Sequence, residues 1–427
     1  MASRLEFSRH HRVAPDQDRG RAWTGAGHRR RSAARPDRDD VDEELTTMSL
    51  GWKKVLTVAT AGVIALSLTA CSSERETPGS NGTEGGQSAE AGGLIGIAMP
   101  TKSLERWNRD GSHLEELLKE KGYETSLQYA DNKVDQQITQ IENMINQGAK
   151  VLVIASIDGT ALAPVLETAA SSGIKVIAYD RLINDTPNVD YYATFDNYKV
   201  GTLQGQFIES TLGLADGKGP YNFEPFAGSP DDNNAKFFFS GAWDVLSKYV
   251  TDGKLVVKSG KAPKSNDDWK SIGILGWGSD DAQDEMENRL NSFYNDGTKV
   301  QVVLSPNDSL ALGIAQALEG AGYKAGDGGD WPVLTGQDAD KANVLNMLAG
   351  KQSMTVWKDT RALGDAVAEM VDQIVTGKDV TVNDTESYNN GNKNVPTNLL
   401  DPQVVLPDQV QSVLVDSGFY TASDLGL

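Results

Sequence analysis

Residues 151–181, VLVIASIDGTALAPVLETAASSGIKVIAYDR, contain two apolar strands on either side of a helix and decide the fold class. Residues 151–154 are apolar throughout, residues 161–171 form the predicted helix, and residues 174–179 repeat the strand. Strands that are buried on both faces read as continuous apolar runs instead of alternating patterns. This strand-helix-strand unit therefore predicts a parallel sheet with helices on both faces.

The same alternation continues on both sides of this unit. We expect further strands at 94–99, 125–130, 254–257, 271–275, 300–304 and 333–335, and helices at 104–121, 138–148, 234–249, 280–294, 309–321 and 342–349. This number of helices and strands is larger than one hydrophobic core can accommodate. We predict an α/β fold of two doubly wound parallel-sheet lobes with a cleft between them.

Cys71 is the single cysteine, and it directly follows an apolar run at 55–70. Trp52-Lys-Lys54 before the run and Leu68-Thr-Ala-Cys71 at its end resemble a bacterial lipoprotein signal. We therefore expect a signal peptide at 48–70, lipidation of Cys71, and a flexible Gly/Ser-rich tether at 71–93. The alternatives are an ordinary signal with an incidental cysteine, or a transmembrane helix, for which the run is short of the roughly 20 residues required.

Residues 1–47 contain ten of the sixteen arginines and three of the four histidines. They are interpreted either as a basic arm for nucleic acid or as an extension upstream of a true start at Met48. We favour the misassigned start, because a nucleic-acid arm makes little sense ahead of an export signal. Cleavage before Cys71 leaves 28 Lys and Arg against 51 Asp and Glu, a net charge of −23, which argues against nucleic acid as a partner.

After that cleavage His113 is the only histidine that remains. A Ser-His-Asp triad or a multi-histidine metal site is then almost excluded. We expect no catalytic residues, no metal and no cofactor.

Ligands of open α/β sheets bind beyond the carboxyl ends of the strands. Ten polar or aromatic residues stand at such ends: Arg106, Trp107, Asp180, Arg181, Asp232, Asn234, Trp277, Asn307, Asp338 and Lys358. Carboxylates, amides and guanidinium groups suit neighbouring hydroxyls, and an indole face suits the C–H face of a pyranose. The set predicts a monosaccharide site. The structural alternatives are that Asn307 only caps a helix and that either tryptophan is only core.

The chain also resembles a known family at these positions. Residues 99–107, 140–148, 176–181, 193–197, 228–235, 336–340 and 395–400 are similar to the monosaccharide-binding proteins of ABC importers, of the xylose-binding and multiple-sugar-binding type. The resemblance implies that all ten residues are sugar contacts. Gly276 departs from the multiple-sugar-binding pattern, which has arginine there, and the loop 261–268 is longer.

The resemblance further implies a type I periplasmic binding protein fold with a three-segment hinge, near residues 195–196, 357–358 and 400–401. One lobe would comprise 94–196 and 358–400, and the other 197–357 and 401–427. The function implied is an exported, lipid-anchored protein on the outer face of the cell membrane. It would capture an aldose such as xylose, glucose or galactose for an ABC transporter permease, as a monomer.

Three other functions are alternatives to transport. A sugar sensor that docks onto a signalling receptor would need the same cleft. A glycosidase using Asp231 and Asp232 is disfavoured, because adjacent carboxylates rarely face each other across a bond at roughly 5 to 9.5 Å. A sugar-responsive repressor would need a helix-turn-helix where this chain has a signal and a tether.

Overall fold

The computed structural model of the protein describes residues 92–427. The predicted upstream extension (1–47), the signal peptide (48–70), Cys71 and nearly all of the tether (71–93) lie outside the described residues.

The first sheet has six strands, all paired in parallel, in the order β11-β5-β4-β3-β1-β2. The strands are β1 (Gly92–Met99), β2 (Tyr123–Tyr129), β3 (Val151–Ile154), β4 (Lys175–Tyr179), β5 (Tyr191–Phe195) and β11 (Thr397–Leu400). Every residue of β3 is buried, and β3 pairs with β1 and β4. The parallel sheet predicted from residues 151–181 is confirmed.

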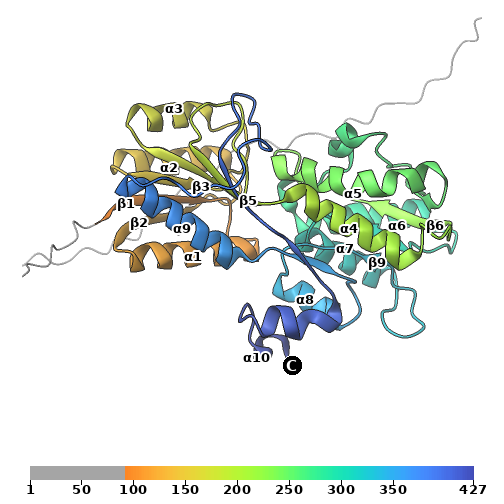
Figure 1. The fold of residues 1–427 in the computed structure, drawn as a ribbon. Helices are drawn as coiled ribbons and strands as arrows, with labels where there is room; N and C mark the ends of the chain where they lie inside the picture. The colour runs from red at the N-terminus through yellow and green to blue at the C-terminus, as the bar shows by residue number, and fades with distance from the viewer. Residues whose placement is uncertain (1–91) are drawn as a thin grey trace, which may run out of the picture. The chain divides into compact units, whose positions relative to one another are not determined.

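Helices cover both faces of this sheet (Figure 1). They are α1 (Glu105–Glu120) and α9 (Thr360–Thr376) on one face, and α2 (Val134–Asn146) and α3 (Ala163–Ser171) on the other. Leu114 of α1 and Val367 of α9 pack in one core cluster with Ile97 of β1. Met144 of α2 and Leu166 of α3 belong to a second cluster. Each face of the sheet therefore has its own apolar core.

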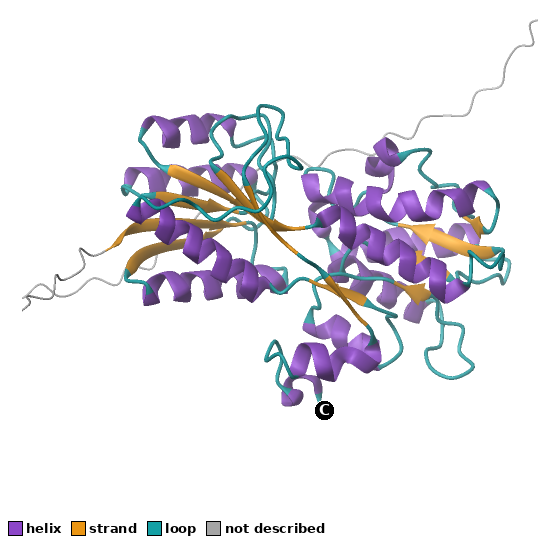
Figure 2. Cartoon of the chain, viewed as in Figure 1, coloured by secondary structure: helices purple, strands orange, loops and turns teal. Residues whose placement is uncertain are grey.

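The second sheet has four parallel strands in the order β7-β6-β8-β9. Its strands are β6 (Tyr221–Pro225), β7 (Leu255–Val256), β8 (Val302–Leu304) and β9 (Val333–Leu334), and its helices are α4 (Asn197–Leu212), α5 (Asn233–Thr251), α6 (Ser279–Phe293) and α7 (Asp308–Gly320) (Figure 2). Helices α4 and α5 approach so closely that a Cβ at Gly201 would overlap the carbonyl of Phe238. Glycine is needed there for the two helices to pack.

The remaining elements form a small subdomain with its own apolar cluster. They are β10 (Thr355–Trp357), antiparallel to β12 (Gln403–Val405), with α8 (Lys341–Leu348), the short turns Pro407–Gln409 and Val410–Val415, and α10 (Ala422–Leu425). Among these elements α8 confirms the helix predicted at 342–349. The others, together with β5, α4, β6, α9 and β11, were not predicted from the apolar pattern.

The strand predicted at 271–275 is wrong. The segment instead belongs to two 3₁₀ turns, η1 (Asn266–Ile272) and η2 (Leu275–Trp277), separated by a single bridge between Ala227 and Gly273. Gly276 and Trp277 both have positive φ, at 66° and 58°, which a strand cannot contain. Ile272 and Ile274 are buried, but the backbone of the segment turns instead of extending.

Both sheets reverse their strand order next to their first strand. In the six-stranded sheet β1 lies between β2 and β3, and in the four-stranded sheet β6 lies between β7 and β8. The crevice at such a reversal is where ligands bind in open α/β sheets. The segments that follow β1, β4, β6, β8 and β9 bring the candidate residues to these carboxyl ends.

Candidate functional site

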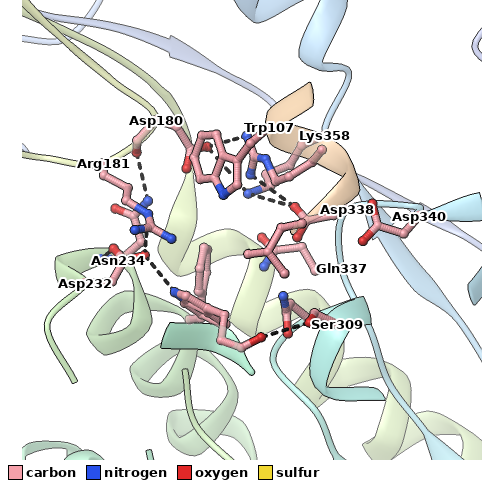
Figure 3. Close-up of a pocket in the computed structure, with 15 residues that line it drawn as sticks. Trp107, Asp180, Arg181, Asp232, Asn234, Ser309, Gln337, Asp338, Asp340 and Lys358 are labelled. Atoms are coloured by element: carbon pink, nitrogen blue, oxygen red, sulfur yellow. Dashed lines mark hydrogen bonds and ion pairs between the residues drawn. The ribbon is translucent and has the colours of Figure 1, made fainter. Parts of the chain in front are cut away.

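A polar pocket lies where segments from both sheets meet, and it has an empty volume of about 390 Å³. Its lining includes all ten predicted site residues, namely Arg106, Trp107, Asp180, Arg181, Asp232, Asn234, Trp277, Asn307, Asp338 and Lys358. Figure 3 shows how these side chains converge from different elements. The structure therefore brings the whole predicted set together.

Arg106, in the first turn of α1, connects three carboxylates. Its Nη2 donates to Asp110 at 2.9 Å and to Asp180 at 3.0 Å, and its Nη1 donates to Asp338 at 3.2 Å. Burial disfavours the charge of Arg106, but the three carboxylates outweigh this effect and raise its pKa well above its usual value. The guanidinium is only 5% exposed and stays positive.

Asp180 directly follows β4 and has a positive φ of 58°. Its backbone carbonyl accepts hydrogen bonds from Tyr192 Oη at 2.7 Å, Thr194 Oγ1 at 2.9 Å and Asn234 Nδ2 at 2.8 Å. Burial alone would raise the pKa of its carboxyl, but the positive charges of Arg106, Lys358 and Arg181 hold that pKa at about 2. Asp180 is therefore an ionised acceptor in a rigid backbone frame.

Asp232 connects Arg181 to Trp277. Its Oδ2 forms an ion pair with Arg181, 2.9 Å from Nε, and accepts a hydrogen bond from Trp277 Nε1 at 3.1 Å. Its Oδ1 accepts the backbone N–H of Asn234 at 2.9 Å, as the N-cap of α5. Arg181 Nη1 also donates to the carbonyl of Ser156 at 3.0 Å. The carboxylate thus fixes a guanidinium and an indole from opposite sides of the pocket.

The two tryptophans have different surroundings. The guanidinium carbons of Arg106 and Arg181 lie 4.4 and 5.1 Å from the Trp107 ring centroid, so both cations contact this indole. Trp277 packs edge-on to Phe238 at 6.2 Å, and a Cβ at Gly228 would overlap its ring. Gly228 therefore lets the backbone approach Trp277 closely.

The two predicted asparagines also have structural partners. Asn234 Oδ1 accepts from Tyr192 Oη at 3.2 Å while its Nδ2 donates to Asp180. Asn307 caps α7, because its Oδ1 accepts the N–H of Leu310 at 3.1 Å. Asn307 thus caps a helix, and its side chain also lines the pocket.

Lys358 and Asp338 complete the pocket. Lys358 Nζ lies 3.2 Å from Asp338 Oδ1 and 3.6 Å from Asp180 Oδ1, and the lysine is 1% exposed. Asp338 has a φ of 100°, a strained conformation for a residue with a side chain. Such strain persists where surrounding contacts hold the backbone, and it is frequent at functional sites.

Five lining residues were not among the ten: Leu104, Phe238, Ser309, Gln337 and Asp340. Position in the chain was the available signal for most of them. Phe238 lies one helical turn after Asn234 in α5, and Gln337 and Asp340 flank Asp338. Burial and the negative charge of Asp338 raise the pKa of Asp340 to about 7.

The pocket can accept hydrogen bonds from a ligand but has no unpaired positive charge. Each of its three cations lies within 3.2 Å of a carboxylate oxygen. In contrast, no group among residues 92–427 donates to Oδ2 of Asp180 or Oδ2 of Asp338. The lining suits an uncharged ligand rich in hydroxyl groups, since hydroxyls donate to such oxygens.

Comparisons with known proteins agree with this architecture. A family model described as a periplasmic binding protein domain matches residues 95–379. The multiple sugar-binding periplasmic receptor ChvE of Rhizobium radiobacter is 50% identical, over 78% of this chain and 92% of the relative. The D-xylose-binding periplasmic protein of Escherichia coli is 37% identical, over 78% of this chain and 92% of the relative.

A solved structure is similar as well. An ABC transporter solute-binding protein from Clostridium phytofermentans, crystallised with β-D-glucose, is 53% identical with a TM-score of 0.74, covering 78% of this chain and 99% of that protein. The fold and the site define a binding protein of two α/β lobes. This chain belongs to the periplasmic binding protein family, with the type I fold.

Two kinds of feature are absent from residues 92–427. That part of the chain has no helix that is long and apolar enough to span a bilayer. It also has no group of three or more His, Cys, Asp or Glu side chains placed to hold a metal ion.

Proposed function

We propose that this protein binds one neutral aldopyranose, such as D-glucose, D-xylose or D-galactose, in the pocket and delivers it unchanged to an ABC transporter permease. The observation that carries the proposal is the pairing of Arg106, Arg181 and Lys358 with carboxylates while Oδ2 of Asp180 and of Asp338 stays available. The names of the relatives, which bind multiple sugars or D-xylose, and the glucose in the similar structure support the same ligand class.

The ten predicted residues then act as sugar contacts. Asp180 and Asp338 accept from sugar hydroxyls, and Arg181, Asn307 and Lys358 donate to sugar oxygens. Hydrogen bonds to charged groups contribute about 1.5–3 kcal/mol each. Several of them, closed off from water, would support about micromolar affinity, near −8 kcal/mol. The Trp277 ring would pack against the apolar C–H face of the sugar.

Closure of the cleft accompanies binding in this proposal. We assign one lobe to residues 94–196 and 358–400, the other to 197–357 and 401–427, and the hinge to the crossings near 195–196, 357–358 and 400–401. The bond from Arg106 in α1 to Asp338 after β9 supports this assignment, since it joins segments from the two sheets at 3.2 Å. A ligand that contacts both lobes favours the closed form.

Export and anchoring complete the proposal. The signal at 48–70 would direct export, lipidation of Cys71 would hold the protein on the outer face of the membrane, and the tether would raise its local concentration at the permease. Replacement of Cys71 by serine tests the anchor. The Cys71→Ser protein should leave the membrane fraction for the medium or periplasm, and retention in the membrane would contradict lipidation.

The ligand test is a thermal-shift screen of the purified protein against neutral aldoses, followed by calorimetry of the hits. We expect stabilisation by at least one aldose, with unchanged sugar recovered after incubation. A screen without any stabilising monosaccharide, or the appearance of a reaction product, would overturn the proposal.

A further inference from the structure

Gln337 has a side-chain oxygen that is buried in the pocket lining without a partner. The residue directly precedes Asp338 and is 1% exposed. Its Nε2 donates to the carbonyl of Pro306 at 3.1 Å, but no group among residues 92–427 donates to its Oε1. In Figure 3 its label lies between those of Asp338 and Ser309, within the cluster of site residues.

The orientation of this amide follows from Pro306. Exchanging the amide oxygen and nitrogen of Gln337 would place two acceptors, Gln337 Oε1 and the Pro306 carbonyl, at about the distance of the present hydrogen bond. That arrangement is repulsive, so Nε2 must face Pro306. The carbonyl oxygen of the side chain is thereby directed away from Pro306.

Two other buried glutamines in the described part of the chain, Gln352 and Gln137, use both ends of the amide. Gln352 Oε1 accepts from Asn343 at 2.7 Å while its Nε2 donates to Asp308 at 2.8 Å. Gln137 Oε1 accepts the N–H of Ile157 at 2.9 Å, and its Nε2 donates to the Ala155 carbonyl at 2.9 Å. An unsatisfied buried acceptor is costly, so its place in the pocket lining indicates a partner that arrives with the ligand.

We propose that Gln337 Oε1 accepts a hydrogen bond from one hydroxyl of the bound sugar and is therefore a specificity-determining residue. This inference rests on the proposed function. Because the Oε1 atom can only accept, the ligand must present a donor at that position. A deoxy or O-methyl sugar leaves the Gln337 oxygen unpaired, and we expect it to bind roughly 5- to 150-fold more weakly.

The test compares the wild type with Gln337→Met, which keeps the length of the side chain and loses the acceptor. Each protein is titrated calorimetrically with the preferred aldose and with each of its monodeoxy and mono-O-methyl derivatives. The wild type should discriminate against the derivative altered at the position facing Gln337. In the variant, the affinity ratio between the parent sugar and this one derivative should shrink at least 5-fold. The ratios for derivatives altered at other positions should stay the same.

Gln204→Met is the matched control. Gln204 Nε2 also donates to the Pro306 carbonyl, at 3.1 Å, and Gln204 does not line the pocket. Its replacement should leave the pattern of discrimination unchanged, whatever it does to the melting temperature. Should Gln337→Met not fold, Gln337→Leu serves as the second variant.

The outcomes separate the two proposals. If the wild type binds aldoses and Gln337→Met shows the same loss of affinity for every derivative, only the role of Gln337 is overturned. A wild type that binds no monosaccharide overturns the proposed function and this inference with it.

Discussion

Nη1 of Arg106 lies 3.2 Å from Oδ1 of Asp338, although the two residues are 232 positions apart in the sequence. Arg106 comes from α1 beside the six-stranded sheet, and Asp338 follows β9 of the four-stranded sheet. The same guanidinium holds Asp110 and Asp180. One arginine thus forms ion pairs with carboxylates from both halves of the pocket.

Replacement of Arg106 by methionine should destabilise the protein by about 3–5 kcal/mol, because buried carboxylates lose their partner. Urea unfolding without sugar measures this loss, and sugar affinity should fall below detection. Arg361→Met is the control, since Arg361 pairs with Asp359 at 2.8 Å in a partly exposed position and should cost about 0–1 kcal/mol. Equal losses for the two variants would contradict the special role of Arg106.

Trp277→Phe keeps an aromatic face but removes the Nε1–H that donates to Asp232 at 3.1 Å. Asp232 then loses one of its hydrogen-bond donors and positions Arg181 less firmly. We therefore expect sugar binding to weaken by about 1–3 kcal/mol. Calorimetric titration with the preferred aldose measures the change. Trp243→Phe alters a core tryptophan that stacks on Phe239 outside the pocket, and its affinity should stay within about twofold of the wild type. Matching losses in both variants would refute the role of the indole donor.

Acidic sugars should bind poorly. A uronate or sugar phosphate brings a negative charge into a lining whose three cations are already paired with carboxylates. An unpaired buried charge is strongly unfavourable, so we expect at least about 100-fold weaker binding than for the neutral parent sugar. Competition titrations of glucose against glucuronate and glucose 6-phosphate test this expectation. Comparable affinity for glucuronate would show that the pocket does supply a free cation.

Asp340 should make stability depend on pH. The backbone N–H of Asp340 donates to Asp308 Oδ2 at 2.9 Å. Burial and the charge of Asp338 raise the pKa of Asp340 from 3.8 to about 7, with Glu105 adding to the effect and Arg109 opposing it. Between these two pKa values the folded state binds a proton that the unfolded state lacks, so stability falls as pH rises through this window.

The free energy of unfolding of Asp340→Asn should therefore decline less between pH 5 and pH 8 than that of the wild type. The difference between the two declines should be about 1–4 kcal/mol. Melting curves of both proteins across this range provide the measurement. The opposite behaviour is expected of Asp180, whose pKa of about 2 gives stability that is present above pH 3.8 and lost as pH falls toward 2. Parallel pH profiles of wild type and Asp340→Asn would contradict the role of Asp340.

The strand-end rule predicted the pocket lining well because it depends only on topology. Apolar runs such as 151–154 define parallel strands, and the residues after such strands must meet at one edge. The sequence alone therefore predicts Arg106, Asp180, Asn307 and Asp338 as site residues. Their grouping into ion pairs could not, since pairing depends on how the two halves meet.

Two features could not be predicted from the apolar periodicity of the sequence. The segment 271–275 has an apolar strand composition, yet Gly276 and Trp277 adopt positive φ and the backbone turns. The unpaired oxygen of Gln337 depends on Pro306, which is adjacent only in three dimensions. Local composition does not determine turn geometry or the hydrogen bonds between distant loops.

The most direct measurement is a calorimetric titration of the purified protein with D-glucose and D-xylose at neutral pH. Capture of a neutral aldose predicts saturable binding of one sugar per chain, at about micromolar affinity or tighter for at least one of the two. The same aldose should no longer bind Arg106→Met. Absence of heat and of thermal stabilisation with these and all other neutral aldoses would contradict the proposal that this pocket is a sugar site.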